Sequence, residues 1–406
     1  MTVFFGDPDG LSDPDYFGRV APLRGDVAGL EFTDSEEEFR LEAREWLRVH
    51  SPGRLPSMDT PDGARAHRAW ERELAAARWS VVAWPHAYGG RDASLVEWVL
   101  FEEEYYAAGA PTRISQNGIS LLAPILFTHG TPEQQHRLLP AMADGTTVWA
   151  QAWSEPEAGS DLAGLRSRAT RDDVRGGWVL TGQKTWSSRA PFADNAFGLF
   201  RTDASAARHR GLTYFLFPLD APGVTVRPIP QLDGDPGFAE IFLDDVFVPD
   251  ADVLGAVGDG WRVAMSTAGN ERGLSLRAPG RFLAAADRLL GLWHERGSAP
   301  DLRDRVADAW IGAQAYRYYT WDAVERGVSG AQGSVNKLFW SELDVALHET
   351  ALDVLGPDQE VTGPWTDDYL FALAGPIYAG TNEIQRTIVA ERVLGLPRGD
   401  DRRARG

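Results

Sequence analysis

The sequence predicts an α+β protein in which helices and strands occupy separate stretches of the chain. Helical periodicity runs through residues 31–147 and returns after Gly260, whereas the section between carries short β-branched and aromatic runs broken by Gly, Pro and Asp. This segregation argues against a parallel βαβ sheet. The chain has 406 residues, more than one hydrophobic core usually serves, so we expect two or three packed subdomains.

The first section is predicted to be a helical domain behind an irregular arm. Residues 1–30 are rich in Asp, Gly and Pro without apolar periodicity, so we expect them to form an N-terminal extension. Phe32, Thr33 and Glu36 give the staple and capping-box pattern that begins a helix. Further helices are predicted at 63–78, 93–108 and 114–129, and from a cap formed by Thr131, Pro132 and Gln134 to about Ala143.

The later sections are predicted to be a β-domain and a second helical domain. Strands are expected at Leu212–Leu219 and Phe238–Val248, and Gly176-Gly177 lies between two strand-like segments. Helices are predicted at 262–295, 301–327, 335–355 and 381–394. The predicted domains are an extension (1–30), a helical domain (31–147), a β-domain (148–258), a C-terminal helical domain (259–398) and a tail (399–406).

Composition excludes several classes of function. The formal net charge of −19 repels a phosphate backbone, which argues against nucleic-acid binding. The absence of cysteine excludes disulfides, thiolate metal sites and a cysteine nucleophile. The eight histidines show no zinc-binding spacing, and no stretch is apolar enough to span a membrane. We therefore expect a cytoplasmic protein without a metal site.

Two features of the charged residues have plain interpretations. Lys184 and Lys337 are the only lysines beside many arginines, a bias that high-GC coding produces. The acidic run Glu102-Glu103-Glu104 is interpreted as a solvated helix face.

Four motifs in order resemble the acyl-CoA dehydrogenase family, over roughly residues 31–398. They are W-P-H-A-Y-G-G at 84–90, A-Q-A-W-S-E-P-E-A-G-S-D at 150–161, L-T-G-Q-K-T-W-S-S-R-A at 180–190, and I-Y-A-G-T-N-E-I-Q-R at 377–386. The resemblance implies an N-terminal helical domain, a central β-barrel or sandwich domain and a C-terminal four-helix bundle that supplies the subunit interface.

The resemblance also implies an FAD cofactor. A flavin ring is flat, apolar and edged with hydrogen-bonding atoms, so a stacking aromatic and small polar groups suit it. The residues implied to bind it are Gln151, Trp153, Ser154, Ser160, Trp186, Ser188, Thr381 and Glu383. Of these, Ser160 is expected near a phosphate, and Thr381 and Glu383 near the flavin nucleotide. The structural alternatives are a core tryptophan at 186 and an ordinary helix start at 381–383.

The implied reaction is α,β-dehydrogenation of an acyl thioester, in which a carboxylate removes the α-proton. Ala379 stands where many relatives carry that carboxylate, although its backbone N–H remains for the thioester oxygen. Glu271 matches an alternative base position found in branched-chain and steroid side-chain members, and Arg272 is expected to be a positioning cation. The alternative is that both are surface charges or a structural ion pair.

Two departures from the common family pattern bear on partners. The R-x-x-F-G segment that reaches a neighbouring subunit's FAD is replaced by His294–Pro300, and the Q-x-x-G-G element by Leu355-Gly356-Pro357. Both resemble heteromeric dehydrogenases that shorten sterol side chains, so we expect a homo- or hetero-tetramer. The expected substrate is an acyl-CoA or acyl-carrier-protein thioester, and the expected electron acceptor is an electron-transfer flavoprotein. A flavin monooxygenase or oxidase and a non-catalytic subunit remain alternatives.

Overall fold

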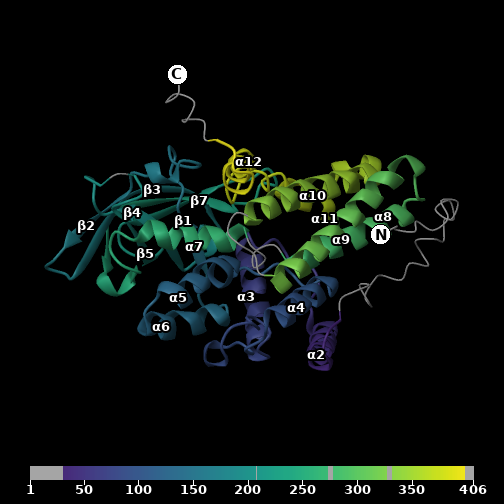
Figure 1. Cartoon of the computed structure of the whole chain (residues 1–406), viewed down its shortest axis with the longest axis horizontal. Helices are drawn as coiled ribbons and strands as arrows, with labels where there is room; N and C mark the ends of the chain where they lie inside the picture. Colours follow the sequence, from purple (N-terminus) through teal and green to yellow (C-terminus); the bar gives the residue numbers. More distant parts are fainter. Residues whose placement is uncertain (1–30, 207, 273–277, 327–331, 398–406) are drawn as a thin grey trace, which may run out of the picture.

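The computed structural model describes residues 31–206, 208–272, 278–326 and 332–397. Figure 1 shows the strands on one side of the molecule, the long C-terminal helices on the other, and the N-terminal helices beneath both. The order along the chain is helices, strands, helices, which confirms the predicted α+β class. The extension 1–30 and the tail 399–406 lie outside the described residues, and the domain boundaries stay predictions.

Two of the N-terminal helices, α2 and α6, begin where the capping patterns predict, and the others lie close to their predicted ranges. The N-terminal helices are α2 (Asp34–His50), α3 (Pro61–Ala76), α4 (Leu95–Ala107), the π-helical segment η3 (Gly118–Leu122), α5 (Ala123–His129) and α6 (Pro132–Ala143). The Thr33 hydroxyl accepts a hydrogen bond from the Glu36 N–H at 3.3 Å, and the Glu36 carboxylate accepts one from the Thr33 N–H at 2.8 Å. An equivalent box at Thr131 and Gln134 begins α6.

One eight-stranded sheet forms the middle of the chain. Its strands are β1 (Trp149–Ala152), β2 (Arg168–Asp172), β3 (Gly177–Ser188), β4 (Asn195–Arg201), β5 (Leu212–Pro218), β6 (Val224–Ile229), β7 (Phe238–Pro249) and β8 (Val253–Leu254). The order is β6-β7-β3-β2-β4-β5-β8, and β1 pairs in parallel with β4. The β2–β3 hairpin turns where Gly176 has a φ of +67°, as its sequence predicts. Among the described strands no pairing joins β6 to β8, so the sheet does not close into a barrel.

The C-terminal part is helical and corrects one predicted element. It contains α7 (Gly260–Arg272), α8 (Pro279–Glu295), α9 (Arg303–Arg326), α10 (Gln332–Leu355), α11 (Pro364–Ala372), α12 (Asn382–Ile388) and the π-helical η9 (Val389–Val393). The single helix predicted over 262–295 is wrong. Ala278 is extended, with φ −59° and ψ 142°, because a residue before proline avoids the helical conformation, and Pro279 then begins α8. Helix α11 had no predicted counterpart.

Short 3-10 helices complete the described elements. They lie at His86–Tyr88, Leu162–Gly164, Ala190–Phe192, Asp250–Asp252, Pro300–Leu302 and Gly356–Glu360.

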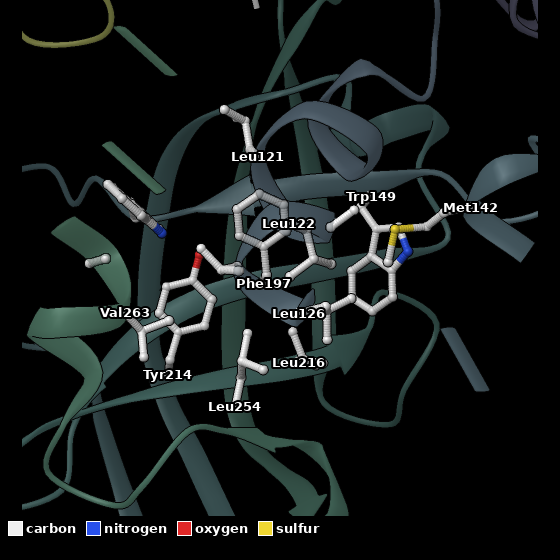
Figure 2. Close-up of a cluster of buried hydrophobic side chains, with 14 of the residues drawn as sticks. Leu121, Leu122, Leu126, Met142, Trp149, Phe197, Tyr214, Leu216, Leu254 and Val263 are labelled. Carbon is white, nitrogen blue, oxygen red and sulfur yellow. The ribbon is translucent and has the colours of Figure 1, made fainter. Parts of the chain in front are cut away.

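A buried apolar cluster joins the N-terminal helices, the sheet and α7. Figure 2 shows Leu122 and Leu126 from the N-terminal helices facing Phe197 and Tyr214 from the strands, with Val263 of α7 beside them. All five side chains are completely buried or nearly so. The first half of α7 is therefore fixed by apolar packing against two other parts of the chain.

The predicted solvated face at Glu102–Glu104 is wrong, because all three glutamates are buried in ion pairs. The distances are between arginine nitrogens and glutamate carboxylate oxygens. Glu102 lies 2.8 Å from Arg113, and Glu103 lies 2.7 and 2.8 Å from Arg317. Glu104 lies 2.8 Å from Arg40 and 2.7 Å from Arg44. Burying a carboxylate is costly unless it is paired, so each glutamate needs its own arginine. We call these three glutamates with their four arginines the α4 ion-pair group.

Helices α4 and α8 touch at a glycine next to this group. A Cβ on Gly280 would lie 2.5 Å from the backbone oxygen of Glu102 and 2.9 Å from the Cα of Glu103. Helix α9 supplies Arg317 to the same junction. The N-terminal and C-terminal helices are thus joined by backbone contact and by a buried ion pair.

Candidate active site

The second and third sequence motifs meet at the ends of β1 and β3. The Ser154 carbonyl accepts a hydrogen bond from the Thr185 N–H at 2.9 Å, and the Lys184 ammonium lies 3.4 Å from the Trp153 carbonyl oxygen. Gln151, Ser154 and Ser188 are half-buried at this edge. Strands β1 and β3, which carry or adjoin five of the residues predicted to bind FAD, therefore lie in contact; the five are Gln151, Trp153, Ser154, Trp186 and Ser188.

A β-bulge turns Trp186 out of the sheet. The register between β3 and β7 shifts between Lys184 and Ser187, and Trp186 has a φ of +59°. Its side chain is 61% exposed. Among the aromatic rings of the described residues, its ring contacts only that of Phe238, edge-on, with 6.0 Å between the centroids. A bulky residue with positive φ and an exposed apolar ring is costly on both counts. Trp186 is therefore not a core residue, and its flat ring is exposed at the surface.

Two buried polar atoms of the second and third motifs have no hydrogen-bond partner among the described residues. The Trp153 ring packs in the core, edge-on to Tyr214 at 6.4 Å, and its indole N–H has no hydrogen-bond partner among the described residues. The Ser187 hydroxyl, which the sequence analysis did not select, is completely buried and likewise unsatisfied within the described chain. Buried polar atoms are normally paired, so such atoms fit a site that is completed by a ligand.

Ser160 lies on an exposed turn that follows this edge. Glu155 and Ala158 exchange backbone hydrogen bonds across the turn, and Asp161 pairs with Arg208. A Cβ on Gly159 would meet nothing within 4 Å, so the turn faces open space.

The fourth motif forms a strained turn ahead of α12. Ala379 and Gly380 both have positive φ, at +56° and +79°, and the Ala379 side chain is buried. The Gln385 side chain donates a 2.8 Å hydrogen bond to the Ala379 carbonyl. Thr381 caps α12 by accepting from the Ile384 N–H at 3.3 Å, and hydrogen bonds from its own backbone N–H and from Thr381 lower the pKa of the exposed Glu383. Thr381 and Glu383 thus form an ordinary helix start, and their cofactor roles stay predictions.

Helix α7 carries Glu271 and Arg272 in its last turn, and the side chains of residues 267–272 lie outside what the structure describes. The helix itself contacts β5, the segments η3 and α5, and α10. The helix that bears the predicted base thus touches all three parts of the chain.

Two further classes of site are not found in the part of the chain that the structure describes. No group of three or more His, Asp or Glu side chains is arranged to hold a metal ion. No helix within those residues has both the length and the apolar character needed to cross a bilayer.

Comparison with known families decides the identity. Residues 33–146, 150–246 and 258–394 match the N-terminal, middle and C-terminal domains of acyl-CoA dehydrogenase. The chain belongs to the acyl-CoA dehydrogenase family. It is an enzyme of that family, whose members are FAD flavoproteins, and this agrees with the predicted activity and cofactor.

Known proteins similar to this acyl-CoA dehydrogenase include a solved structure named as a steroid ACAD. The chain is 42% identical to acyl-CoA dehydrogenase IpdE1 of Mycolicibacterium smegmatis over 385 residues, 89% of this chain and 98% of the relative. A solved structure named Tcur3481-Tcur3483 steroid ACAD shares 27% identity and a TM-score of 0.81, covering 92% of this chain and 100% of that one. The ChsE4-ChsE5 complex from Mycobacterium tuberculosis shares 27% identity and a TM-score of 0.78, over 92% and 100%.

Proposed function

We propose that this acyl-CoA dehydrogenase catalyses FAD-dependent α,β-dehydrogenation of an acyl-CoA thioester, with Glu271 as the base that removes the α-proton. The observation that carries the proposal is the alanine at position 379. An alanine there, in a motif otherwise intact, has no carboxylate, while Glu271, in the last turn of α7, matches the alternative base position by sequence. Helix α7 contacts both the sheet and α10, which supports a role in a site between them.

The residues at the β1–β3 edge suit a flavin. When bound, FAD supplies the acceptor for the hydrogen that leaves the β-carbon as hydride. Trp186 would stack on the flavin ring, and Gln151, Ser154, Ser188 and the Trp153 indole N–H would serve its polar edge. Ser160 would lie near a phosphate, with Thr381 and Glu383 near the nucleotide.

The chain's own groups divide the remaining chemistry. Glu271 takes the α-proton, and Arg272 helps to position the thioester. The Ala379 N–H donates to the thioester oxygen, where negative charge develops as the proton leaves. A left-handed turn at 379–380 fixes the direction of that N–H, which fits a role that depends on preorganised donors.

A second chain and an electron acceptor complete the proposal. Several large apolar side chains are exposed in the C-terminal part of the chain, including Ile311, Phe339, Ile377 and Leu394. Exposed apolar side chains suit a subunit interface. Two structural neighbours are named as two-component assemblies, which favours a partner of the same fold in a homo- or hetero-tetramer. Electrons would leave to an electron-transfer flavoprotein, and a steroid side-chain thioester is the first acyl group to test.

The Glu271→Gln substitution tests the base assignment. Anaerobic bleaching of the flavin by a saturating acyl-CoA is expected to slow by about 10²–10⁴-fold, the usual contribution of a general base. Glu295→Gln, which removes an exposed carboxylate on the neighbouring α8, is the matched control and should bleach at the wild-type rate. Equal rates for Glu271→Gln and wild type would exclude Glu271 as the base.

A double variant separates loss of a base from damage to the site. Placing a carboxylate at the other position, as Glu271→Gln with Ala379→Glu, is expected to recover part of the lost rate. A product that forms only with oxygen would instead indicate a monooxygenase or oxidase. Activity that resides wholly in a co-purifying homologue would indicate a non-catalytic subunit.

A further inference from the structure

The only two lysines of the chain are both completely buried. The chain has 40 basic residues, and Lys184 on β3 and Lys337 on α10 alone are lysines. Both side chains are 0% exposed. A coding bias accounts for the scarcity of lysine on the surface. It does not account for two lysines at fully buried positions, which lysine rarely occupies.

Lys184 ties three segments together at the β1–β3 edge. Its ammonium donates to the Glu155 carboxylate at 2.8 Å, to the Leu199 carbonyl at 2.7 Å and to the Trp153 carbonyl at 3.4 Å. An ammonium has three donors, so these three acceptors satisfy it completely. A guanidinium has five donors in a fixed fork and would leave some of them unpaired in this enclosed position.

Glu155 extends the contact of Lys184 into the loop after β1. Its carboxylate also accepts hydrogen bonds from the backbone N–H groups of Arg166 at 2.6 Å and Ser167 at 2.9 Å. Burial raises the pKa of Glu155, whereas Lys184 and these donors lower it. Their combined effect is the larger one, so the pKa of Glu155 lies below its ordinary value. The ion pair therefore fixes the ends of the loop that carries Ser154 and Ser160. Lys184 is also only two residues before Trp186 in the sequence of β3.

Lys337 makes the corresponding contact for the turn at 379–380. Its ammonium donates to the Asn382 side-chain oxygen at 2.6 Å, and the Ser341 hydroxyl donates to the same oxygen at 3.1 Å. The Asn382 N–H in turn donates to the Pro376 carbonyl at 2.8 Å. These bonds connect α10 to both ends of the strained turn, which spans Ile377 to Thr381.

We infer that Lys184 and Lys337 are positioning residues, each of which holds one segment of the active site against the scaffold. Lys184 holds the flavin-facing loop and bulge, and Lys337 holds the turn that presents the Ala379 N–H. The inference rests on the proposed function for the location of the site. It explains why lysine persists at two positions of a chain that otherwise uses arginine.

Flavin affinity tests the role of Lys184 without any turnover. Apoprotein is titrated with FAD, and the visible absorption spectrum of the complex is recorded. Lys184→Met and Lys184→Arg should each raise the FAD Kd at least about tenfold and alter the flavin spectrum, because a misplaced loop loses about 1.4 kcal/mol or more. Rescue by arginine, or a Kd within twofold of wild type in both variants, would overturn the inference for Lys184.

Reduction kinetics test the role of Lys337. Lys337→Met should slow anaerobic flavin reduction at saturating acyl-CoA by about 100-fold, the cost of a displacement of about 1 Å at a reacting centre, with the substrate Kd nearly unchanged. An unchanged limiting rate would overturn this half of the inference. The Lys184 titration does not depend on Glu271, so failure of the proposed base would not mimic failure here.

A control and two milder variants keep the tests decisive. Arg317→Met breaks a buried ion pair elsewhere and should destabilise the protein without changing the FAD Kd. A raised Kd in this control would show that any buried pair affects the flavin, and would count against the inference. If a lysine variant does not fold, Glu155→Gln removes the negative charge and one acceptor oxygen opposite Lys184, and Ser341→Ala removes the hydrogen bond from Ser341 to Asn382. They should weaken flavin binding and flavin reduction, respectively, by several-fold, and wild-type values would refute the inference.

Discussion

The α4 ion-pair group and the active-site segments differ in backbone strain and in how their buried polar groups are paired. In the ion-pair group each buried glutamate has at least one arginine within 2.8 Å, although Glu102 Oε1 and Arg113 Nη2 make no hydrogen bond within the described residues, and none of the seven residues has a positive φ. At the site, Trp186 and Ala379 have positive φ, and the Trp153 indole and Ser187 hydroxyl are buried without partners in the described residues.

This difference distinguishes residues that stabilise the fold from residues that are arranged to bind a ligand. Buried charges of opposite sign stabilise each other across the junction between domains and need no ligand to do so. Strained backbone and unsatisfied donors cost free energy in the free protein and are offset only where a ligand uses them. Substitutions in the ion-pair group should therefore lower the free energy of unfolding, whereas substitutions that relieve strain at the site should leave it unchanged or raise it.

Breaking the ion-pair group should give the largest effect on stability. Arg317→Met leaves the buried Glu103 carboxylate without its counter-ion and with only the hydrogen bond from Trp321, which should reduce the free energy of unfolding by about 3–5 kcal/mol. Urea denaturation of the apoprotein measures this loss. Activity per folded molecule should stay at the wild-type level, and a loss of activity without a loss of stability would erase the contrast between the two regions.

A second satisfied pair should give a smaller, pH-dependent effect. Asp344 is buried and pairs with Arg281 at 2.9 and 3.1 Å. Burial alone raises its pKa, but Arg281 and His348 lower the pKa to about 2, below the ordinary 3.8. Because the folded-state pKa is the lower one, this stabilisation is complete above pH 3.8 and is lost as the pH falls toward 2.

The loss should amount to about 2 kcal/mol across that interval. Urea midpoints at pH 5 and pH 2.5 measure it in the wild type and in Asp344→Asn. The variant should be less stable at pH 5 and should show a smaller decrease at low pH. An equal decrease in both proteins would mean that other carboxylates account for it.

The bulge at Trp186 should show the opposite behaviour from the ion pairs. Trp186→Gly removes the exposed ring and relieves the left-handed backbone, so the apoprotein should be no less stable than wild type. Loss of the stacking surface should raise the FAD Kd about tenfold, or about 1.4 kcal/mol. Trp310→Gly, in the middle of helix α9, should lower stability instead.

Residue 379 should give the smallest change. Ala379→Gly relieves a positive φ and should raise the free energy of unfolding by about 1 kcal/mol. Ala285→Gly, at a buried position in the middle of α8, should lower it by about 1 kcal/mol and is the matched control. A destabilised Ala379→Gly would show that the turn is not strained.

Local signals in the sequence predicted most of the fold, because the interactions behind them are local. Thr33 with Glu36 and Thr131 with Gln134 form capping boxes three residues apart, and the Gly176-Gly177 turn joins adjacent strands. Trp186 was selected by its motif, but its strain was not predictable, because the bulge depends on the register against β7.

The charged residues were the least predictable part. Glu103 and Arg317 are 214 residues apart, so nothing in the run of three glutamates indicates that it is buried. The roles of Lys184 and Lys337 depend in the same way on acceptors brought together only by the folded chain. The assignments of Glu271 and Arg272 came from resemblance, and they await the substitutions described above.

The three consecutive glutamates of α4 also restrict how this helix can change in evolution. Successive residues of an α-helix point about 100° apart, so the three carboxylates project in three directions, toward arginines from a loop, from α9 and from α2. Inserting or deleting one residue upstream in α4 would rotate all of them together and abolish every pairing at once. The length of α4 ahead of Glu102 is therefore fixed by the three ion pairs.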